Sequence, residues 1–141
     1  MHFPDYVVKV QEAIKGQDKI TFVGFIQNTE ALFNGCDIVV NNSNNTRSES
    51  LGTTIYEAMA CEKIVIASST GGTPEIINNN HEGLLFKTED VADLEAKLAY
   101  AIDHFFELDH IRLQARQKVL QRFNIKAMAK SYHAVIKQLH V

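Results

Sequence analysis

The chain has 141 residues, which suits a single domain with a sizeable core. Hydrophobic residues make up 45% of it and charged residues 22%, a composition typical of soluble globular proteins. The formal net charge of −3 indicates no basic face, so nucleic acids and anionic membranes are poor candidate partners.

The N-terminus and the cysteines bear on localisation. No stretch approaches the roughly 18 consecutive apolar residues of a membrane span, and the first ten residues, MHFPDYVVKV, do not resemble a signal peptide. We therefore expect a cytoplasmic protein without a transmembrane segment, and peripheral membrane attachment through a missing partner domain stays open. Cys36 and Cys61 follow no disulfide or metal pattern, which indicates buried thiols in a reducing compartment.

The first half of the chain alternates helical and extended patterns. In chain order these patterns predict a helix over 5–14, a strand over 20–25, a short helix over 28–37 and a strand over 38–43. Gly16 ends the first helix, and Asn28 or Thr29 caps the second.

The second half continues the alternation and ends in helices. The patterns predict a helix over 53–61, a strand over 63–69, a short helix within 70–77, a strand over 82–86, and three amphipathic helices that start near Thr88 or Asp90, near Asp109 and near Asn124. Pro74 suits the first turn of the short helix. The first of the three closing helices has an apolar stripe that is expected to join the core, namely Val91, Leu94, Leu98 and Ile102.

Apolar strands that alternate with helices imply an α/β fold with a parallel sheet. We expect a single Rossmann-like domain whose sheet has about four strands and is covered by helices. Such sheets bind ligands beyond the carboxyl ends of their strands, where strands run into helix N-termini. The loops NNSNNTRSES and SSTGGTPE are both strand-to-helix turns of this kind.

Two glutamates frame the loop-to-helix turn RSESLGTTIYEAMA, residues 47–60. The helix in this stretch has an apolar face that is expected to pack on the sheet, made of Ile55, Ala58 and Met59. Glu57 lies on a different face with Thr53 and Thr54. Helical side chains lean toward the helix N-terminus, so the Glu57 carboxylate should point toward the loop that carries Glu49.

The start of this helix offers free backbone N–H groups and a partial positive charge, which favour phosphates. Gly52 leaves room for a ligand to approach the backbone closely. Carboxylates repel phosphate but accept hydrogen bonds from hydroxyls, so the segment suits a ligand with a central diphosphate and hydroxyls at each end, such as a nucleotide sugar. From spacing alone a plainer alternative stays open, in which Glu57 is a solvated helix residue and Glu49 a loop charge.

The residue order around the two glutamates resembles a known family. The run ESLGTTIYEAMACEKIVIASSTGGTPEII, residues 49–77, is similar to the retaining GT-B glycosyltransferases of family 4, the glycosyl transferases group 1 family. These enzymes have two glutamates with seven residues between them, then Ala-Met-Ala, an apolar strand and a Gly-Gly-x-Pro-Glu turn. Weaker similarity at ITFVGF, CDIVVNNS, EGLLF and the closing helices extends the resemblance over about residues 20–138.

The resemblance implies a role for each matching position. Glu57 would bind the ribose hydroxyls of the donor nucleotide, and Glu49 would act as the catalytic glutamate that contacts hydroxyls of the transferred sugar. Ile26 would lie near the base. The remaining implied donor-binding positions are Ser50, Leu51, Gly52 and Thr53, whose backbone would lie beside the diphosphate and sugar, and the cleft-lining Gly71 and Gly72.

The resemblance also implies a second domain. Family members have two Rossmann-like domains with the active site between them. Residues 1–141 resemble the C-terminal, donor-binding domain, and we expect from the resemblance that the N-terminal acceptor domain and the first donor-domain strands are absent from them. No cofactor or metal is expected, because the nucleoside diphosphate sugar is a substrate. Glu62 stands where the family usually has a helix-ending glycine, and a positive φ there would cost up to about 1 kcal/mol.

The sequence leaves other functions open beside a hexosyltransferase of polysaccharide biosynthesis. The chain would also suit a non-catalytic nucleotide-sugar-binding or regulatory module, or a fragment of a GT-B epimerase or phosphorylase. Its six histidines form no metal-ligand spacing, so no metal site is expected. The last helix has an apolar stripe that either joins the core or packs against the partner domain, namely Ile125, Met128, Tyr132, Val135 and Leu139.

Overall fold

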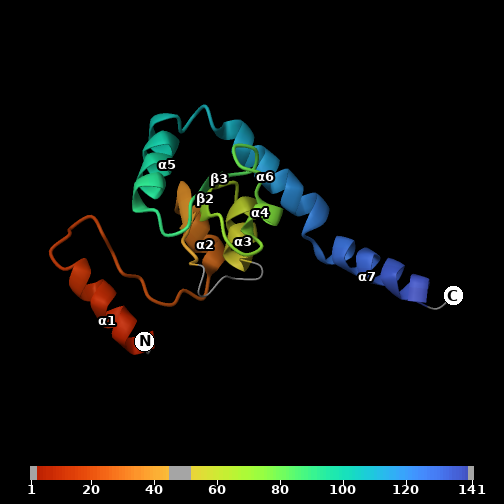
Figure 1. The fold of residues 1–141 in the computed structure, drawn as a ribbon, viewed down its shortest axis with the longest axis horizontal. Helices are drawn as coiled ribbons and strands as arrows, with labels where there is room; N and C mark the ends of the chain where they lie inside the picture. The colour runs from red at the N-terminus through yellow and green to blue at the C-terminus, as the bar shows by residue number, and fades with distance from the viewer. Residues whose placement is uncertain (1–2, 45–51, 140–141) are drawn as a thin grey trace.

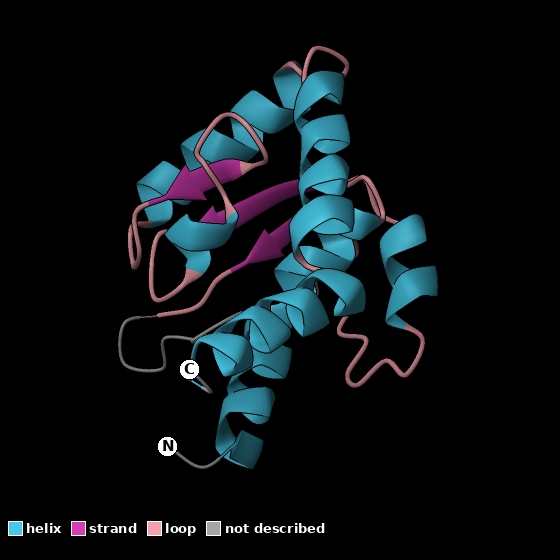
Figure 2. Ribbon diagram, turned by 90° about the vertical axis from the view of Figure 1, so that its right-hand side faces the viewer, coloured by secondary structure: helices cyan, strands magenta, loops and turns pink. Residues whose placement is uncertain are grey.

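The computed structural model describes residues 3–44 and 52–139 (Figure 1). Its elements in chain order are α1 (Phe3–Ala13), α2 (Thr29–Asn34), β1 (Ile38–Asn41), α3 (Thr53–Ala60), β2 (Ile64–Ser68), α4 (Thr73–Ile76), β3 (Leu84–Phe86), α5 (Val91–Asp103), α6 (Asp109–Arg122) and α7 (Ile125–Leu139). Within these ranges three strands form one parallel sheet in the order β1-β2-β3, surrounded by helices (Figure 2). The predicted α/β fold is therefore confirmed.

Helices cover both faces of the sheet, so its central strand, β2, is buried along its whole length. Val65 and Ala67 of β2 join one core cluster, to which α2, α3, α4 and α6 contribute. Ile64 and Ile66 join a second cluster with β3, α5 and the start of α6. Successive side chains of a strand point to opposite faces, so an apolar strand without polar alternation can be the centre of a three-layer fold.

Side-chain caps confirm three of the predicted helix starts. Asn28, Asp90 and Asn124 each accept a hydrogen bond from the backbone N–H three residues further on, at 3.0, 3.1 and 2.9 Å. Such bonds satisfy N–H groups that the helix itself leaves free. Asn28, and not the alternative Thr29, therefore caps α2.

A left-handed residue closes the C-terminus of α3. Glu62 has a φ of 56°, a conformation usual for a helix-ending glycine, and its N–H donates to the Met59 carbonyl at 3.1 Å. The next residue, Lys63, donates to the Ala58 carbonyl at 3.1 Å, which completes a Schellman motif. The motif turns the chain directly from α3 into β2.

The predicted strand over 20–25 is wrong. The segment between α1 and α2 has no regular structure and pairs with none of the described strands. It loops away from the sheet together with α1 (Figure 1), and Phe25 is 90% exposed. A strand obtains its hydrogen bonds only from a neighbouring strand, so β-forming side chains without such a neighbour do not make one.

The apolar stripes of α5 and α7 are less buried than predicted. In α5, Leu94 and Leu98 are half-buried, but Val91 and Ile102 are exposed and Ala101 fills the buried position. No residue of α7 is buried, because this helix extends away from the body of the molecule beyond α6 (Figure 1). The core assignment of the α7 stripe is therefore wrong, and its packing against a partner domain stays a prediction. Neither α7 nor any other helix in the described ranges has the length and apolar character of a membrane span.

Cys36 and Cys61 are both free thiols. Each is only half-buried, so the prediction of buried thiols is wrong. The reason is their position: Cys36 follows the end of α2 and Cys61 is the C-cap residue of α3. Helix ends lie nearer the surface than the helix faces that pack on the sheet.

A buried ion pair joins α6 to the loop between α4 and β3. The Lys118 ammonium lies 3.3 Å from a carboxylate oxygen of Glu82, and the two side chains are 9% and 14% exposed. Glu82 also accepts hydrogen bonds from the Asn78 N–H at 2.8 Å and the Asn78 side-chain amide at 3.1 Å. Removing one partner of a buried pair typically costs about 3–5 kcal/mol, since the other charge is left without compensation.

Candidate functional site

Parallel pairing brings the two predicted ligand loops to one edge of the sheet. β1 and β2 pair from Ile38 opposite Ile64 to Asn41 opposite Ala67. The chain leaves β1 toward α3 at this edge, and it leaves β2 toward the Gly71–Gly72 turn at the same edge. The carboxyl edge of an α/β sheet is where such folds bind ligands.

α3 begins at this edge with an N-terminus that has no side-chain cap. Gly52 is the buried N-cap residue, with a φ of −71°. The Ile55 N–H donates to the Gly52 carbonyl at 3.0 Å, whereas the N–H groups of Thr53 and Thr54 have no carbonyl to reach within the helix. Together with the helix dipole, these free donors give the edge a partial positive charge.

Glu57 lies one turn into α3 on its solvent-exposed side. The opposite face of the helix consists of the fully buried Ile55, Ala58 and Met59, as predicted. Thr53 and Thr54 are exposed like Glu57, and no other residue in the described ranges bonds to the Glu57 carboxylate. A free carboxylate near a helix N-terminus can accept hydrogen bonds from the hydroxyls of a ligand.

The Gly71–Gly72 turn presents backbone to the edge. Gly71 has a φ of 53°, a left-handed conformation that favours glycine. Gly72 is buried and is the N-cap residue of α4, again without a side-chain cap. The turn closes when the Thr73 N–H donates to the Thr70 carbonyl at 3.1 Å.

A serine clamp, formed by Ser43 and Ser68, joins the roots of the two loops. Ser68 is the last residue of β2 and fully buried, and its hydroxyl donates to the Ser43 carbonyl at 2.7 Å. The same hydroxyl oxygen accepts a hydrogen bond from the Ser43 N–H at 3.1 Å. Sequence reasoning missed this contact because its partners are 25 positions apart and follow no motif.

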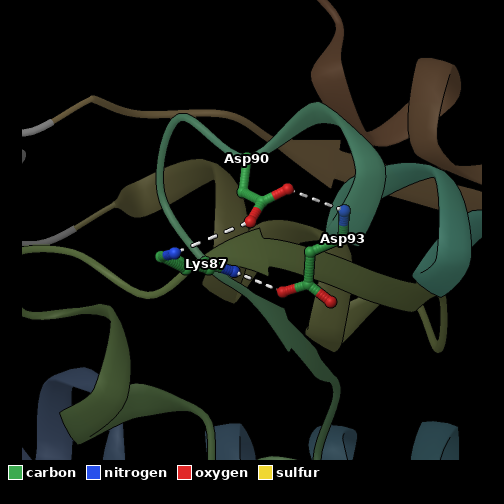
Figure 3. Close-up of polar contacts among 3 residues, drawn as sticks. All are labelled: Lys87, Asp90 and Asp93. Atoms are coloured by element: carbon green, nitrogen blue, oxygen red, sulfur yellow. Dashed lines mark hydrogen bonds and ion pairs between the residues drawn. The ribbon is translucent and has the colours of Figure 1, made fainter.

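A third turn at this edge leads from β3 into α5 (Figure 3). The Asp93 carboxylate accepts a hydrogen bond from the Lys87 N–H at 2.7 Å, and an Asp90 oxygen lies 3.7 Å from the Lys87 ammonium. A hollow of about 600 Å³ opens beside this turn, lined by Ser69, Asn79, Leu85, Phe86, Lys87 and Thr88. Both aspartates are engaged in holding the turn, so their role here is structural.

Tyr56 lies beside Glu57 in the sequence but packs toward the α6–α7 corner. Its ring lies 4.6 Å from that of Phe123, centroid to centroid. The Tyr56 hydroxyl is buried and finds no hydrogen-bond partner in the described part of the chain. Burial, and secondarily the charge of Glu75, raises the pKa of this hydroxyl above its ordinary value of 10.0.

The other predicted site residues are either undescribed or lie outside the core. Glu49, Ser50 and Leu51 lie outside the described residues. Ile26 is half-buried in the irregular segment before α2 and belongs to neither core cluster. Among the residues that the structure does describe, no three His, Cys, Asp or Glu side chains gather to form a metal site. Among the described site residues, the start of α3 and the Gly71–Gly72 turn follow the carboxyl ends of the neighbouring strands β1 and β2.

Comparison with known proteins decides the family. The model of the family described as glycosyl transferases group 1 matches residues 4–118. The chain belongs to this family. The match includes the Glu49–Glu57 motif, the Gly71–Gly72 turn and all three strands of the sheet.

The relatives of this group 1 chain are much longer than it is. It is 29% identical over 123 residues to the N,N'-diacetylbacillosaminyl-diphospho-undecaprenol alpha-1,3-N-acetylgalactosaminyltransferase of Campylobacter jejuni. The matched segment covers 85% of this chain and 32% of the relative. It is 31% identical over 107 residues to the D-inositol 3-phosphate glycosyltransferase of Mycobacterium tuberculosis. This match covers 74% of this chain and 21% of the relative. The chain therefore spans about a third or less of the length of these relatives.

Solved glycosyltransferase structures share the fold of this group 1 chain. A glycosyltransferase from Rickettsia africae superposes with a TM-score of 0.89 at 29% identity, over 96% of this chain and 37% of that one. HepE of Anabaena in complex with UDP superposes with a TM-score of 0.88 at 25% identity, with the same coverage. The parallel sheet and its helices thus match the C-terminal Rossmann-like domain of GT-B glycosyltransferases.

Proposed function

We propose that this chain is the donor-binding domain of a retaining, family 4 glycosyltransferase that transfers a hexose from a nucleoside diphosphate sugar to an acceptor hydroxyl. The observation that carries the proposal is the uncapped start of α3, with the free carboxylate of Glu57 beside it, at the edge that also holds the Gly71–Gly72 turn. The related fold of HepE in complex with UDP, and with UDP-glucose, supports a nucleotide sugar as the ligand.

In this proposal the middle of the donor lies against the start of α3. The free N–H groups there meet the diphosphate, with Gly52 allowing close approach and Ser50, Leu51 and Thr53 contributing backbone groups. The Gly71–Gly72 turn borders the same cleft.

The nucleoside end and the sugar end of the donor each lie beside a carboxylate in this proposal. Glu57 accepts hydrogen bonds from the ribose hydroxyls, and Glu49 contacts hydroxyls of the transferred sugar at the reacting end. Ile26 lies near the base. Carboxylates suit these positions because they accept hydrogen bonds from hydroxyls and repel a misplaced phosphate.

The chain contributes to the reaction by stabilising charge that develops on the leaving diphosphate. As the bond between the sugar and the diphosphate breaks, negative charge grows on the phosphate oxygen beside the start of α3. Fixed N–H donors and a helix dipole interact more strongly with the growing charge than with the intact donor, which lowers the barrier. The proposal needs no metal ion and no cofactor. The acceptor hydroxyl would be held by the N-terminal acceptor domain of the whole protein.

Nucleotide titration with a ribose probe tests the proposed site. We expect UDP or GDP to bind this chain weakly and Glu57→Gln to weaken the binding about tenfold, since hydrogen bonds to a charged group contribute about 1.5–3 kcal/mol. The 2′,3′-dideoxy form of the same nucleotide should bind wild type and Glu57→Gln alike, because it lacks the hydroxyls that Glu57 would contact.

A matched control separates the site from general charge effects. Asp103→Asn removes an exposed helix carboxylate at the last residue of α5, at the opposite end of that helix from the sheet edge, and should leave nucleotide affinity unchanged. Equal affinity of wild type and Glu57→Gln for the ribonucleotide would remove Glu57 from the ribose role. Failure of wild type to bind either nucleotide would overturn the proposed function.

A non-catalytic nucleotide-sugar-binding or regulatory module is the second candidate, because the contacts assigned to Glu57 and the start of α3 would bind a nucleotide sugar whether or not the sugar is transferred. Under the first proposal the reaction needs the acceptor-binding domain of the whole protein, so residues 1–141 alone should not turn over. Reading the coding sequence upstream of Met1 separates the two candidates. About 200 further residues with Rossmann-like strands would support the enzyme, whereas a genuine start codon would support the module.

A further inference from the structure

We propose that Ser68 is a positioning residue for donor binding, because it fixes the loop that leaves β1 relative to the Gly71–Gly72 turn. The inference rests on the proposed function and adds a residue that makes no contact with the donor itself. It starts from the serine clamp, in which one side-chain oxygen both donates to and accepts from the main chain of Ser43.

The clamp is built to hold a fixed distance. Ser68 is fully buried and Ser43 half-buried, and the two hydrogen bonds between them are 2.7 and 3.1 Å long. Because both the N–H and the carbonyl of Ser43 are engaged, two bonds hold the backbone of Ser43 against the end of β2. The Ser43 hydroxyl adds a bond to the Asn41 side chain at 3.2 Å, so the exit from β1 is held from both sides.

A short, hydrogen-bonded path connects the clamp to the glycine turn. The Ser69 N–H donates to the Phe86 carbonyl of β3 at 2.8 Å, and the Thr70 N–H donates to the Ser68 carbonyl at 2.9 Å. Gly71 follows directly. The exit from β1 at Ser43 and the Gly71–Gly72 turn therefore share one anchor at Ser68.

The sheet itself does not depend on the clamp. β1 and β2 pair over four residues on each strand, and the Ile64 N–H adds a bond to the Asp37 carbonyl at 3.2 Å at the opposite end. Ser68 is a member of neither core cluster. Loss of the clamp should thus free the root of the loop while the fold persists.

The inference is tested by measuring both nucleotide affinity and thermal stability in variants of Ser68 and in a control variant. Ser68→Ala should weaken UDP or GDP binding about tenfold, the equivalent of 1.4 kcal/mol, because the two loops lose their common anchor. Lys118→Met is the matched control, since it removes a buried ion pair of α6 and should lower the melting temperature at least as much while affinity stays within about twofold. Ser68→Cys, nearly the same size but a weaker donor, should fall between wild type and Ser68→Ala.

Amide hydrogen exchange provides a readout that needs no ligand. The Ser43 amide should exchange faster in Ser68→Ala than in wild type and should be unaffected by Lys118→Met. If wild type binds nucleotide and Ser68→Ala binds equally well, or loses no more affinity than Lys118→Met, Ser68 has no positioning role and the proposed function stands. If wild type binds neither nucleotide, the proposed function fails, and this inference fails with it.

Discussion

Arg116 of α6 holds the carboxylate of Glu62 at the end of α3, with its Nε 3.4 Å from Glu62 Oε1. The Nη1 of the same arginine donates to the Ala60 carbonyl at 2.5 Å. One side chain thus caps the last turn of α3 and pairs with the residue whose φ is 56°. α3 also carries Glu57 and the free N-terminus of the proposed site, so this contact fixes the far end of the helix on which the site is built.

The left-handed backbone at Glu62 predicts an order of stabilities. Glu62→Gly relieves the backbone strain and should be at least as stable as wild type, because the half-exposed ion pair that it loses contributes only about 0–1 kcal/mol. Glu62→Val should lower the free energy of unfolding by about 1–2 kcal/mol, since a β-branched residue strongly resists this conformation. Urea denaturation of the three proteins measures the order. A valine variant as stable as the glycine variant would contradict the strain argument.

The close approach of Gly83 to the central strand predicts a large effect from one methyl group. A Cβ at Gly83 would lie 2.8 Å from the Val65 carbonyl oxygen, so backbone must shift to admit it. Gly83→Ala should therefore lower the free energy of unfolding by about 1–3 kcal/mol. In the control Gly35→Ala the new Cβ meets the Leu32 carbonyl at an ordinary 3.5 Å, and the change should stay within about 0.5 kcal/mol. Thermal denaturation that shows similar losses for both variants would rule out the proposed steric conflict.

Tyr56 predicts a loss of stability in alkali. Because the pKa of its hydroxyl is raised in the folded protein, the unfolded chain releases this proton first as the pH passes 10.0. This contribution to stability is complete below that pH and is lost as the pH rises through the folded pKa. Tyr56→Phe removes the effect, so its stability relative to wild type should increase above about pH 10.

The same variant should be harmless at neutral pH. Phenylalanine keeps the contact with the Phe123 ring and removes a buried hydroxyl that has no partner among the described residues. Its stability at neutral pH should thus equal or exceed that of wild type. Urea denaturation across the pH range makes the comparison, and lysine titration affects both proteins alike. Identical pH profiles would show that Tyr56 does not ionise differently on unfolding.

Elements whose hydrogen bonds and signals are local could be predicted from the sequence. The helix starts at Asn28, Asp90 and Asn124 and the buried face of α3 all followed from residues within one or two helical turns. The continuous apolar run of β2 correctly predicted a strand buried on both faces. The motif around Glu57 also pointed to the family that the comparison shows.

Contacts between distant residues were decided by the tertiary structure alone. Residues 20–25 have the composition of a strand but no neighbouring strand among the described residues, and the α7 stripe has helical spacing but nothing to cover it there. The serine clamp and the burial of Lys118 join residues 25 or more positions apart. Helices and turns close their hydrogen bonds within a few residues, so the sequence determines them. Strands, clamps and buried charges need a partner from elsewhere in the chain, and only folding places that partner.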